Sequence, residues 1–304
     1  MAYESDYLVD RRRLKRRLAI WRTVAVVAIV AAIAAAYGRL GDTVVGGDFI
    51  ARLSIDGIIV QDDQRLQAIR DLADNDSVKA VILRIDSPGG TVVGGETLYR
   101  AVLELGKEKP VVAVMDGVAA SAAYMTAIAA DRLFAREGTL TGSIGVILQT
   151  TEVTRLLEMI GVSARSFKSG TLKAVPSPVE RITPEIEAAT QSLIDEMYKM
   201  FRDMVLERRN MKPADASRFS DGRIFTGRQA LKNGLIDQIG GEQAAIAWLE
   251  SEKGIPADIS VRKVKLNRDV DKLFDRLDSL ARKTILSERL TLDGLISVWH
   301  PQLR

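Results

Sequence analysis

Two short runs of almost continuous aliphatic residues, 80–85 and 111–115, constrain the fold of this chain more than any other feature. An unbroken run of Val, Ile and Leu is typical of a strand that is buried on both faces, whereas a half-exposed strand alternates apolar and polar residues. Between the two runs, residues 94–107 carry apolar side chains at helical spacing. The order strand, helix, strand predicts an α/β fold with parallel strands and helices packed outside the sheet.

The same alternation continues on both sides of this unit. Residues 50–55 predict a strand and residues 62–74 a helix, while 121–130 predict a helix of small residues and 133–135 a short strand. Thr183-Pro184-Glu185 has the pattern of an N-cap followed by proline, which predicts a helix that runs to about Arg209. We expect its apolar stripe to lie in the core or at a subunit interface; the stripe consists of Ile186, Leu193, Met197, Met200, Phe201 and Met204.

The N-terminal region has the charge pattern of a membrane anchor. Residues 1–22 hold seven Lys or Arg residues against three acids, and residues 23–37 carry no charge. Extended back to Leu18, the apolar segment reaches about 20 residues, which is enough for a helix that spans roughly 30 Å of hydrocarbon. We therefore predict a single transmembrane helix at residues 18–37.

Basic residues beside a membrane helix stay in the cytoplasm, so the chain after the anchor is expected on the other side. On this interpretation residues 1–17 form a basic cytoplasmic segment and residues 38–47 a linker. A cleavable signal peptide is the alternative, because Ala34-Ala-Ala36 resembles a cleavage site. Either way, the rest of the chain is predicted to be exported.

The composition argues against two classes of site. The chain has no cysteine and one histidine, which argues against disulfides, thiolate ligands and a zinc centre, so we expect no metal. Its net charge of +3 is too small to support nucleic-acid binding.

Ser121 is the strongest candidate for a nucleophile. It lies in Gly117-Val-Ala-Ala-Ser121-Ala-Ala-Tyr124, between a predicted strand and a predicted helix, among residues too small to shield its hydroxyl. A serine hydroxyl is nearly inert unless a base takes its proton. Because the single histidine, His300, lies at the end of the chain, the base is expected to be a lysine or a carboxylate. A serine that only caps a helix is the alternative.

Five further motifs stand around Ser121: Asp86-Ser-Pro-Gly-Gly90, Thr139-Leu-Thr-Gly-Ser-Ile-Gly-Val146, Lys168-Ser-Gly-Thr-Leu-Lys173, Asp221-Gly-Arg-Ile-Phe-Thr-Gly-Arg-Gln-Ala230 and Gly234-Leu-Ile-Asp237. Together with the serine segment, and in this order, they resemble the signal peptide peptidase A (SppA) family of Ser-Lys proteases. The resemblance covers roughly residues 48–250. Each motif alone is weak, but six in register are strong.

The resemblance implies that Ser121 is the nucleophile and Lys173 its general base. Lys168 is the competing lysine, because it opens the same motif. A lysine in water has a pKa of about 10.4, so a lysine that acts as a base near neutral pH must be desolvated.

By the same resemblance, the N–H groups of Gly90 and Ala122 form an oxyanion hole, and Ser143 orients the lysine amine. The family pattern usually has two glycines after the nucleophile, where this chain has Ala122 and Ala123. Alanine still supplies an N–H, but it would be strained if that position needed a positive φ.

The resemblance further implies a Clp-protease/crotonase-like spiral of ββα units, here over residues 48–260. Residues 268–285 have a polar, amphipathic pattern of their own, so 261–304 is expected to be an amphipathic C-terminal extension. Long members of the family carry two copies of the motif set and short ones a single copy, as here, so a homo-oligomeric ring is expected. The expected activity is that of an endopeptidase at the periplasmic or extracytoplasmic side of the inner (plasma) membrane, without a cofactor. Its substrates would be remnant signal peptides and other extended peptides, cut after small or apolar residues. The alternatives are a crotonase-like acyl-CoA hydratase or isomerase and an inactive membrane scaffold.

Overall fold

The structure is a computed structural model that describes residues 17, 20–30, 47–266 and 296–298. It divides into two units, Met1–Gly47 and Asp48–Arg304. In the first unit, residues 20–30 form a solvent-exposed helix. Within the described parts of the chain, no helix is both long and apolar enough to cross a membrane. The anchor at 18–37 extends outside the described residues and stays a prediction, and so does the amphipathic segment at 268–285.

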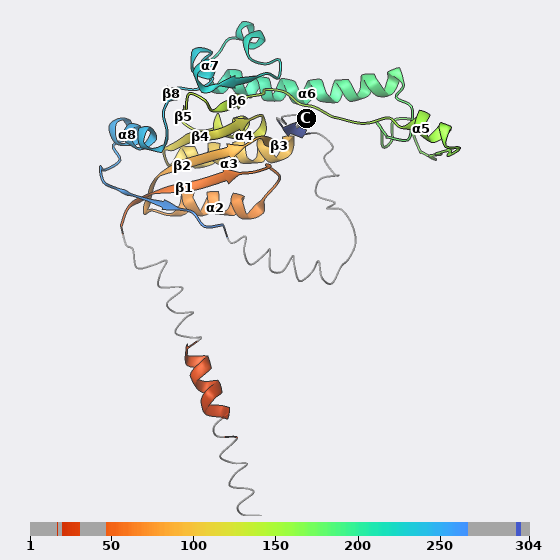
Figure 1. Ribbon diagram of the computed structural model, residues 1–304. Coiled ribbons are helices and arrows are strands. Elements are labelled where there is room, and N and C mark those ends of the chain that lie inside the picture. Colours follow the sequence, from red (N-terminus) through yellow and green to blue (C-terminus); the bar gives the residue numbers. More distant parts are fainter. Residues whose placement is uncertain (1–16, 18–19, 31–46, 267–295, 299–304) are drawn as a thin grey trace, which may run out of the picture. The chain divides into compact units, whose positions relative to one another are not determined.

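The second unit is an α/β fold (Figure 1). Its elements, in chain order, are β1 (Phe49–Asp56), α2 (Asp63–Asp74), β2 (Val78–Ser87), β3 (Gly89–Thr91), α3 (Val92–Glu108), β4 (Val111–Ala120), α4 (Ala122–Ala127), β5 (Arg132–Ala135), β6 (Leu140–Gly142), α5 (Thr154–Met159), α6 (Pro184–Arg208), the 3₁₀ helix η1 (Pro213–Arg218), β7 (Ile224–Thr226), α7 (Gly227–Lys232), β8 (Gln238–Ile239), α8 (Glu242–Lys253), β9 (Ser260–Lys263) and β10 (Ile296–Val298).

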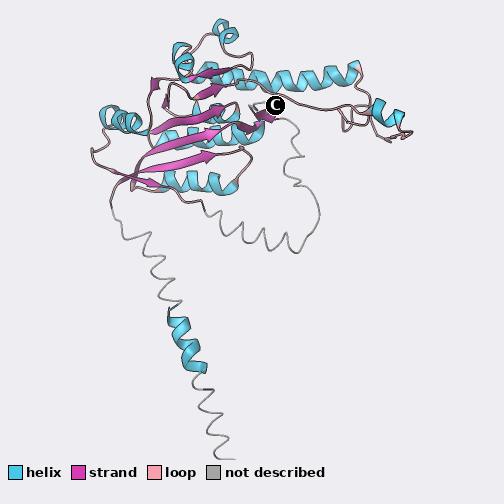
Figure 2. Cartoon of the chain, viewed as in Figure 1, coloured by secondary structure: helices cyan, strands magenta, loops and turns pink. Residues whose placement is uncertain are grey.

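The main sheet has the strand order β7-β6-β4-β2-β1-β9, and β5 joins β4 to β8. The pairs β1–β2, β2–β4 and β4–β5 are parallel, which confirms the prediction from the two aliphatic runs. The edge pair β6–β7 is antiparallel, so the sheet is mixed. Figure 2 shows helices on both sides of the strands.

Both faces of the central strands are buried, which explains why their sequences are almost continuously apolar. On β2, Val81, Leu83 and Ile85 belong to the large core cluster on the side of α2, α3 and α4. The alternate residues Ala80 and Ile82 pack in a second cluster with residues of α8. Burial of one such aliphatic side chain stabilises the fold by about 1.5–3 kcal/mol.

Strand β4 pairs with two different strands along its length. Val112–Met115 pairs with β5, whereas Val118–Ala120 pairs with β6. Opposite this change, the register with β2 shifts between Ile85 and Ser87. The strand therefore continues beyond the predicted end at residue 115, and Ser121 follows directly after its last residue.

Helix α6 is confirmed at the predicted position, but only part of its stripe is buried. Phe201 and Ile186 are buried, whereas Leu193 is 46 % exposed. We call residues 147–183, the segment before α6, the arm. The arm includes α5. In Figure 1, α5 lies at the end of α6 that is farther from the sheet.

Tyr124, on α4, anchors the Gly234–Asp237 motif. Its buried hydroxyl donates a hydrogen bond of 2.7 Å to the Leu235 carbonyl. Burial raises the pKa of Tyr124. The neighbouring Asp237 carboxylate accepts hydrogen bonds from Arg209 and from the Leu133 N–H. This motif therefore fastens β5, α4 and the end of α6 together.

We expect Tyr124→Phe to lower the free energy of unfolding by about 1–3 kcal/mol at neutral pH, because the buried Leu235 carbonyl loses its donor. The raised pKa means that the native phenol stays protonated while the unfolded one ionises, so the stabilisation is complete below about pH 10 and lost above it. Urea unfolding at several pH values measures both effects. The gap between the wild type and Tyr124→Phe should shrink above about pH 10.

Tyr99→Phe is the control at neutral pH, since the buried Tyr99 makes no side-chain hydrogen bond with other described residues. Equal losses in the two variants would contradict the role of the Tyr124 hydrogen bond.

Candidate active site

Ser121 occupies a strained turn between β4 and α4. Its backbone has φ 58° and ψ −121°, in the region of positive φ that residues with a Cβ rarely adopt. Its N–H donates to the Gly142 carbonyl at 2.8 Å, and its carbonyl accepts from the Met125 N–H at 2.8 Å. Such strain persists only where the surroundings enforce it, and it clusters at functional sites. A serine on a strained strand-to-helix turn is the arrangement of a nucleophile elbow.

The predicted length of the helix after this turn and the predicted exposure of Ser121 both need correction. The predicted helix at 121–130 is shorter, Ala122–Ala127, and the positive φ falls on Ser121 rather than on Ala122, so alanine is accommodated after the serine. The small neighbours also do not leave Ser121 open to solvent, because its exposed fraction is 1 %. Their size serves close packing instead: a Cβ on Gly95 of α3 would lie 2.8 Å from the Cβ of Ala122.

The Thr139–Val146 motif holds the turn from one side. Thr139 Oγ1 donates to the Asp116 carbonyl at 2.5 Å, and Thr141 Oγ1 donates to the Ala119 carbonyl at 2.7 Å. Gly142, with φ +83°, supplies the carbonyl that binds the Ser121 N–H. The motif therefore fixes the backbone that leads into the serine.

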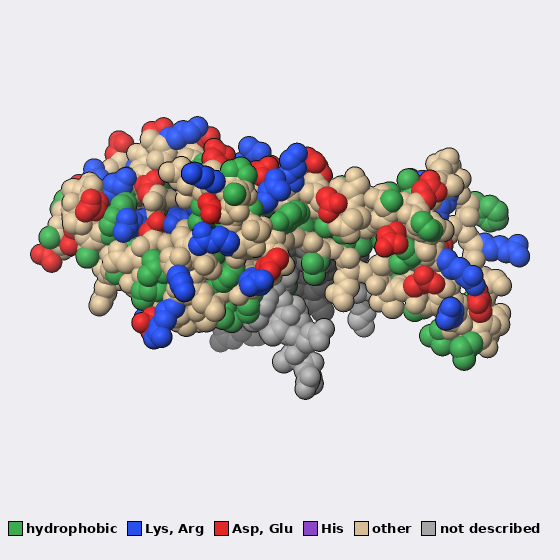
Figure 3. Space-filling view, turned by 90° about the horizontal axis from the view of Figure 1, so that it is seen from above, with side chains coloured by type: hydrophobic (Ala, Val, Ile, Leu, Met, Phe, Trp, Pro, Cys, Tyr) green, Lys and Arg blue, Asp and Glu red, His purple; other side chains and the backbone are tan. Residues whose placement is uncertain are grey.

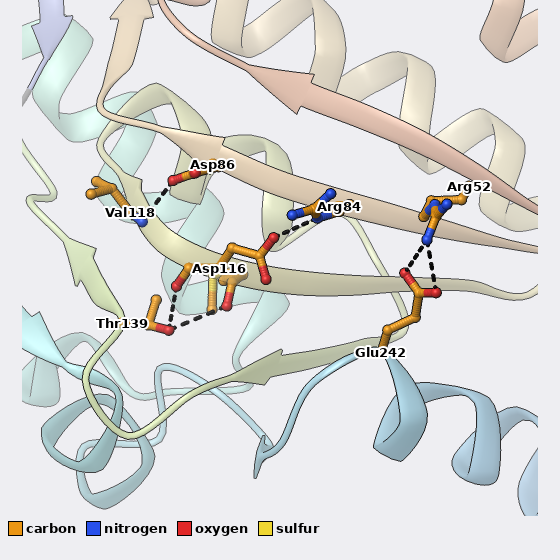
Figure 4. A network of polar contacts seen from close by, with 8 residues as sticks. Arg52, Arg84, Asp86, Asp116, Val118, Thr139 and Glu242 are labelled. Atoms are coloured by element: carbon orange, nitrogen blue, oxygen red, sulfur yellow. Dashed lines mark hydrogen bonds and ion pairs between the residues drawn. The ribbon is translucent and has the colours of Figure 1, made fainter. Parts of the chain in front are cut away.

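The Asp86–Gly90 motif holds the turn from the other side. The Asp86 carboxylate accepts a hydrogen bond of 3.1 Å from the Val118 N–H, and Arg84 binds the Asp116 carboxylate at 2.5 Å (Figure 4). The hydrogen bond to Asp116 raises the pKa of Arg84. These contacts join the ends of β2 and β4, which carry the Gly90 loop and the Ser121 turn.

Gly90 is required by close packing of the backbone. A Cβ at this position would lie 1.8 Å from the Ile59 carbonyl oxygen. Ile59 bonds both neighbours of Gly90: its N–H donates to the Gly89 carbonyl and its carbonyl accepts from the Thr91 N–H, each at 2.8 Å. Because successive residues of a strand point their N–H groups to opposite sides, the Gly90 N–H points away from Ile59. Strand β3 also contacts α4, so this N–H lies on an element next to the serine turn.

Ser121 and Ser143 line one cavity of about 330 Å³. Ser143 has φ 50°, and its N–H donates to the Arg223 carbonyl at 2.9 Å. The remaining lining comes from the segment after β6, one face of α6 and the turn before β7; its residues are Ile144, Gly145, Val146, Ile147, Gln191, Ile194, Asp195, Tyr198, Ser220, Asp221 and Gly222.

The α6 residues of this lining were not expected from the sequence. Gln191, Asp195 and Tyr198 recur every three to four residues, which is the spacing of one helical face. That polar face adjoins the apolar stripe, and only the stripe forms a recognisable pattern in the sequence. Tyr198 donates to the Ser220 carbonyl at 2.7 Å and thereby closes one wall of the cavity.

Neither candidate lysine reaches this cavity within the described part of one chain. Lys168 and Lys173 both lie in the arm, and no described residue from 148 to 190 lines the cavity. Lys168 Nζ forms an ion pair of 2.5 Å with Glu180, and this hydrogen bond lowers the pKa of the Glu180 carboxyl. The exposed Lys173 has no side-chain partner among the described residues. Of the two, Lys173 is therefore the one whose ammonium is not already engaged.

Comparison with known proteins assigns this arrangement to a family. Residues 104–256 match the profile of peptidase family S49, and residues 61–141 match that of Clp protease. A protein of Synechocystis sp. that is named as a protease is 38 % identical over 211 residues, which are 69 % of this chain and 76 % of that protein.

Two other relatives are longer. The chloroplastic serine protease SPPA of Arabidopsis thaliana is 34 % identical over 80 % of this chain and 36 % of its own length. Protease 4 of Salmonella typhi is 35 % identical over 61 % of this chain and 30 % of its own length. The chain thus spans about a third of each of these two proteins.

Among solved structures, a point mutant of the membrane-bound stomatin-specific protease 1510-N covers 73 % of this chain and 99 % of its own, with a TM-score of 0.44 and 16 % identity. The sequence matches carry the assignment, together with the mixed α/β sheet and the Clp-protease match. This chain, with its Clp-protease-like fold, belongs to peptidase family S49, as a member of the SppA family.

Proposed function

We propose that this chain is a membrane-anchored serine endopeptidase that uses Ser121 as nucleophile and Lys173 as general base. The observation that carries the proposal is the strained backbone of Ser121 beside a cavity, in a chain of a peptidase family. Ser121 Oγ attacks the peptide carbonyl while the lysine amine takes its proton. The ammonium formed in this way then protonates the leaving nitrogen. Water hydrolyses the acyl-enzyme, with the neutral lysine again as base.

Two N–H groups stabilise the oxyanion in this mechanism. Ala122 is the first residue of α4, so its N–H has no acceptor within the helix. The Gly90 N–H points away from Ile59 and forms the second donor. Loss of one such donor typically costs about 3–4 kcal/mol of transition-state stabilisation. Ser143, on the same cavity, orients the lysine amine.

The lysine is supplied by a neighbouring copy of the chain. The arm that carries Lys173 exposes large apolar side chains: Phe167 is 97 % exposed, Met159 84 % and Ile160 65 %. Hydrophobic side chains also lie among charged ones toward the right-hand end of the view in Figure 3. Several large apolar side chains exposed on one short segment are typical of an interaction site. Assembly into a homo-oligomeric ring would cover the arm and bring Lys173 to the next Ser121.

The membrane location and the substrates belong to the same proposal. A helix at 18–37 holds the protein in the plasma membrane, and the basic residues before it place the catalytic unit outside the cytoplasm. The substrates are extended peptides, including remnants of signal peptides, cut after small or apolar residues. Family membership and the N-terminal pattern both favour this function over a hydratase or isomerase.

A fluorophosphonate probe tests whether the site is a working serine hydrolase. We expect the detergent-solubilised full chain to be labelled at Ser121, because only a serine activated by a base attacks such a probe rapidly. Peptide mapping by mass spectrometry locates the label, and heat-denatured protein is the control. An unlabelled native protein would favour the inactive scaffold, and label at another residue would show that Ser121 is not the nucleophile.

A further inference from the structure

The cavity beside Ser121 is acidic. Its lining contains two carboxylates, Asp195 of α6 and Asp221 of the turn before β7, and no lysine, arginine or histidine among the described residues. Asp221 is paired within its own turn, because both of its carboxylate oxygens accept hydrogen bonds from Arg223. Asp195 forms no ion pair with another described residue, and its carboxylate accepts a hydrogen bond of 2.7 Å from the neutral side chain of Gln191. The cavity therefore carries one negative charge, on Asp195, that no described cation compensates.

The hydroxyl groups on the same wall act as acceptors. Tyr198 donates its one hydroxyl proton to Ser220, and Ser220 Oγ donates its own to the Ala216 carbonyl at 2.6 Å. Because this proton is committed, the Tyr198 oxygen offers only its acceptor positions to the cavity. Asp195 and Tyr198 lie three residues apart on α6, so they share one helical face. The wall therefore presents acceptors, and the group that complements it is a positively charged donor.

Aliphatic side chains from the segment after β6 and from α6 also line the cavity. Val146 and Ile194 pack in one small cluster, and Ile147 is exposed beside them in the lining. The cavity volume of about 330 Å³ is ample for one long side chain, since about 150 Å³ accommodates a benzene molecule. Lysine and arginine lay their methylene groups along apolar surface and keep the charged end at a polar partner. Such a side chain matches this lining, whereas a small or purely apolar one would leave Asp195 without a counter-charge.

We propose that Asp195 is a specificity-determining residue: it selects peptides with a lysine or arginine close to the scissile bond and binds that side chain in the cavity beside Ser121. This inference rests on the proposed function, because it concerns the substrate of the same site. The basic residue in the cavity and the small or apolar residue at the cut are different positions of the substrate. Successive side chains of an extended peptide point to opposite sides, so different walls of the site contact the two positions.

Paired fluorogenic peptides test this assignment in the detergent-solubilised full chain. A single lysine stands in turn at each of the three positions before and after the cut, and each peptide has a partner with norleucine, which keeps the aliphatic stem and lacks the charge. At the position that faces the cavity, we expect kcat/KM to be about tenfold higher for the lysine peptide, the effect of one hydrogen bond to a charged group. In Asp195→Asn this ratio should fall to about one, and Asp195→Lys should favour glutamate at the same position.

Glu196→Gln is the matched control for the loss of charge. Glu196 is exposed on the same helix and does not line the cavity, so this variant should keep the lysine preference of the wild type. A ratio that stays near ten in Asp195→Asn would overturn the inference. A wild type that hydrolyses the lysine and norleucine peptides equally at every position would overturn it as well.

A binding assay separates this inference from the proposed catalytic function. In the Ser121→Ala protein, where no turnover is expected, the lysine peptide should bind about tenfold more tightly than the norleucine peptide. A further Asp195→Asn substitution should abolish that difference. This result would support the inference even if the wild type hydrolysed neither peptide, in which case the proposed function alone would fail. Equal binding of the two peptides to the Ser121→Ala protein would overturn the role of Asp195.

Discussion

Ser121→Ala should reduce peptide hydrolysis by a factor of about 10⁴ to 10⁶, as removal of the nucleophile does in other serine hydrolases. The substitution deletes one oxygen and keeps the Cβ. The positive φ at position 121 therefore strains the wild type and the Ser121→Ala variant to the same extent. The bonds that hold the turn come from the backbone of Gly142 and Met125, and they remain. Initial rates on a peptide substrate measure the loss.

Fold and assembly should be unaffected by this substitution. Size-exclusion chromatography and urea unfolding of Ser121→Ala should match those of the wild type. Ser251→Ala, at an exposed position of helix α8, is a matched exchange that should keep full activity. A Ser121→Ala protein that cleaves peptides at the rate of the Ser251→Ala protein would remove Ser121 from the mechanism.

The core of the fold could be predicted because it depends on local pattern. In the runs at 80–85 and 111–115, alternate positions carry apolar side chains for one face of the sheet, and the positions between carry them for the other face, with the exposed Arg84 as the exception. Only a central strand covered by helices on both sides has this requirement. The parallel pairing of β1, β2 and β4 then follows from the helices between them.

The geometry of the site depends on long-range contacts and was predicted less well. Nothing near Ser121 in the sequence shows that the positive φ lies on the serine, because the Gly142 carbonyl that holds its N–H comes from β6. The polar face of α6 reaches the cavity only because α6 packs through Phe201 and Val205. A sequence pattern identifies which face of a helix is buried, but not what the next face meets.

The motifs also turned out to differ in kind. Gly234–Asp237 is structural, since Tyr124 and Arg209 bind it on the side of the core. The Asp86–Gly90 and Thr139–Val146 motifs position the Ser121 turn through backbone contacts. The Lys168–Lys173 motif stands apart, because in the described part of a single chain none of its residues lines the cavity beside Ser121. Its position in the exposed arm is what makes assembly the central question.

Lys173→Ala should lower kcat/KM by about 10²- to 10⁴-fold, the usual contribution of a general base. Lys168→Ala should lose far less, because Lys168 Nζ is engaged in an ion pair with Glu180 within the arm and does not line the cavity. Steady-state rates of the two variants, made and assayed side by side, give the comparison. An inactive Lys168→Ala protein beside an active Lys173→Ala protein would exchange the two roles.

Mixing inactive subunits decides whether the base acts in the neighbouring chain. Ser121→Ala and Lys173→Ala proteins are mixed in equal amounts under conditions that let subunits exchange, and exchange is verified with two fluorescent labels. In a ring where each site takes its serine from one subunit and its lysine from the next, about one quarter of the sites carry both intact residues, so about a quarter of wild-type activity should return. If both residues of a site belong to one chain, each mixed site lacks one of them and no activity returns. Demonstrated exchange without rescue would therefore place the Ser121 and the Lys173 of each site on one chain.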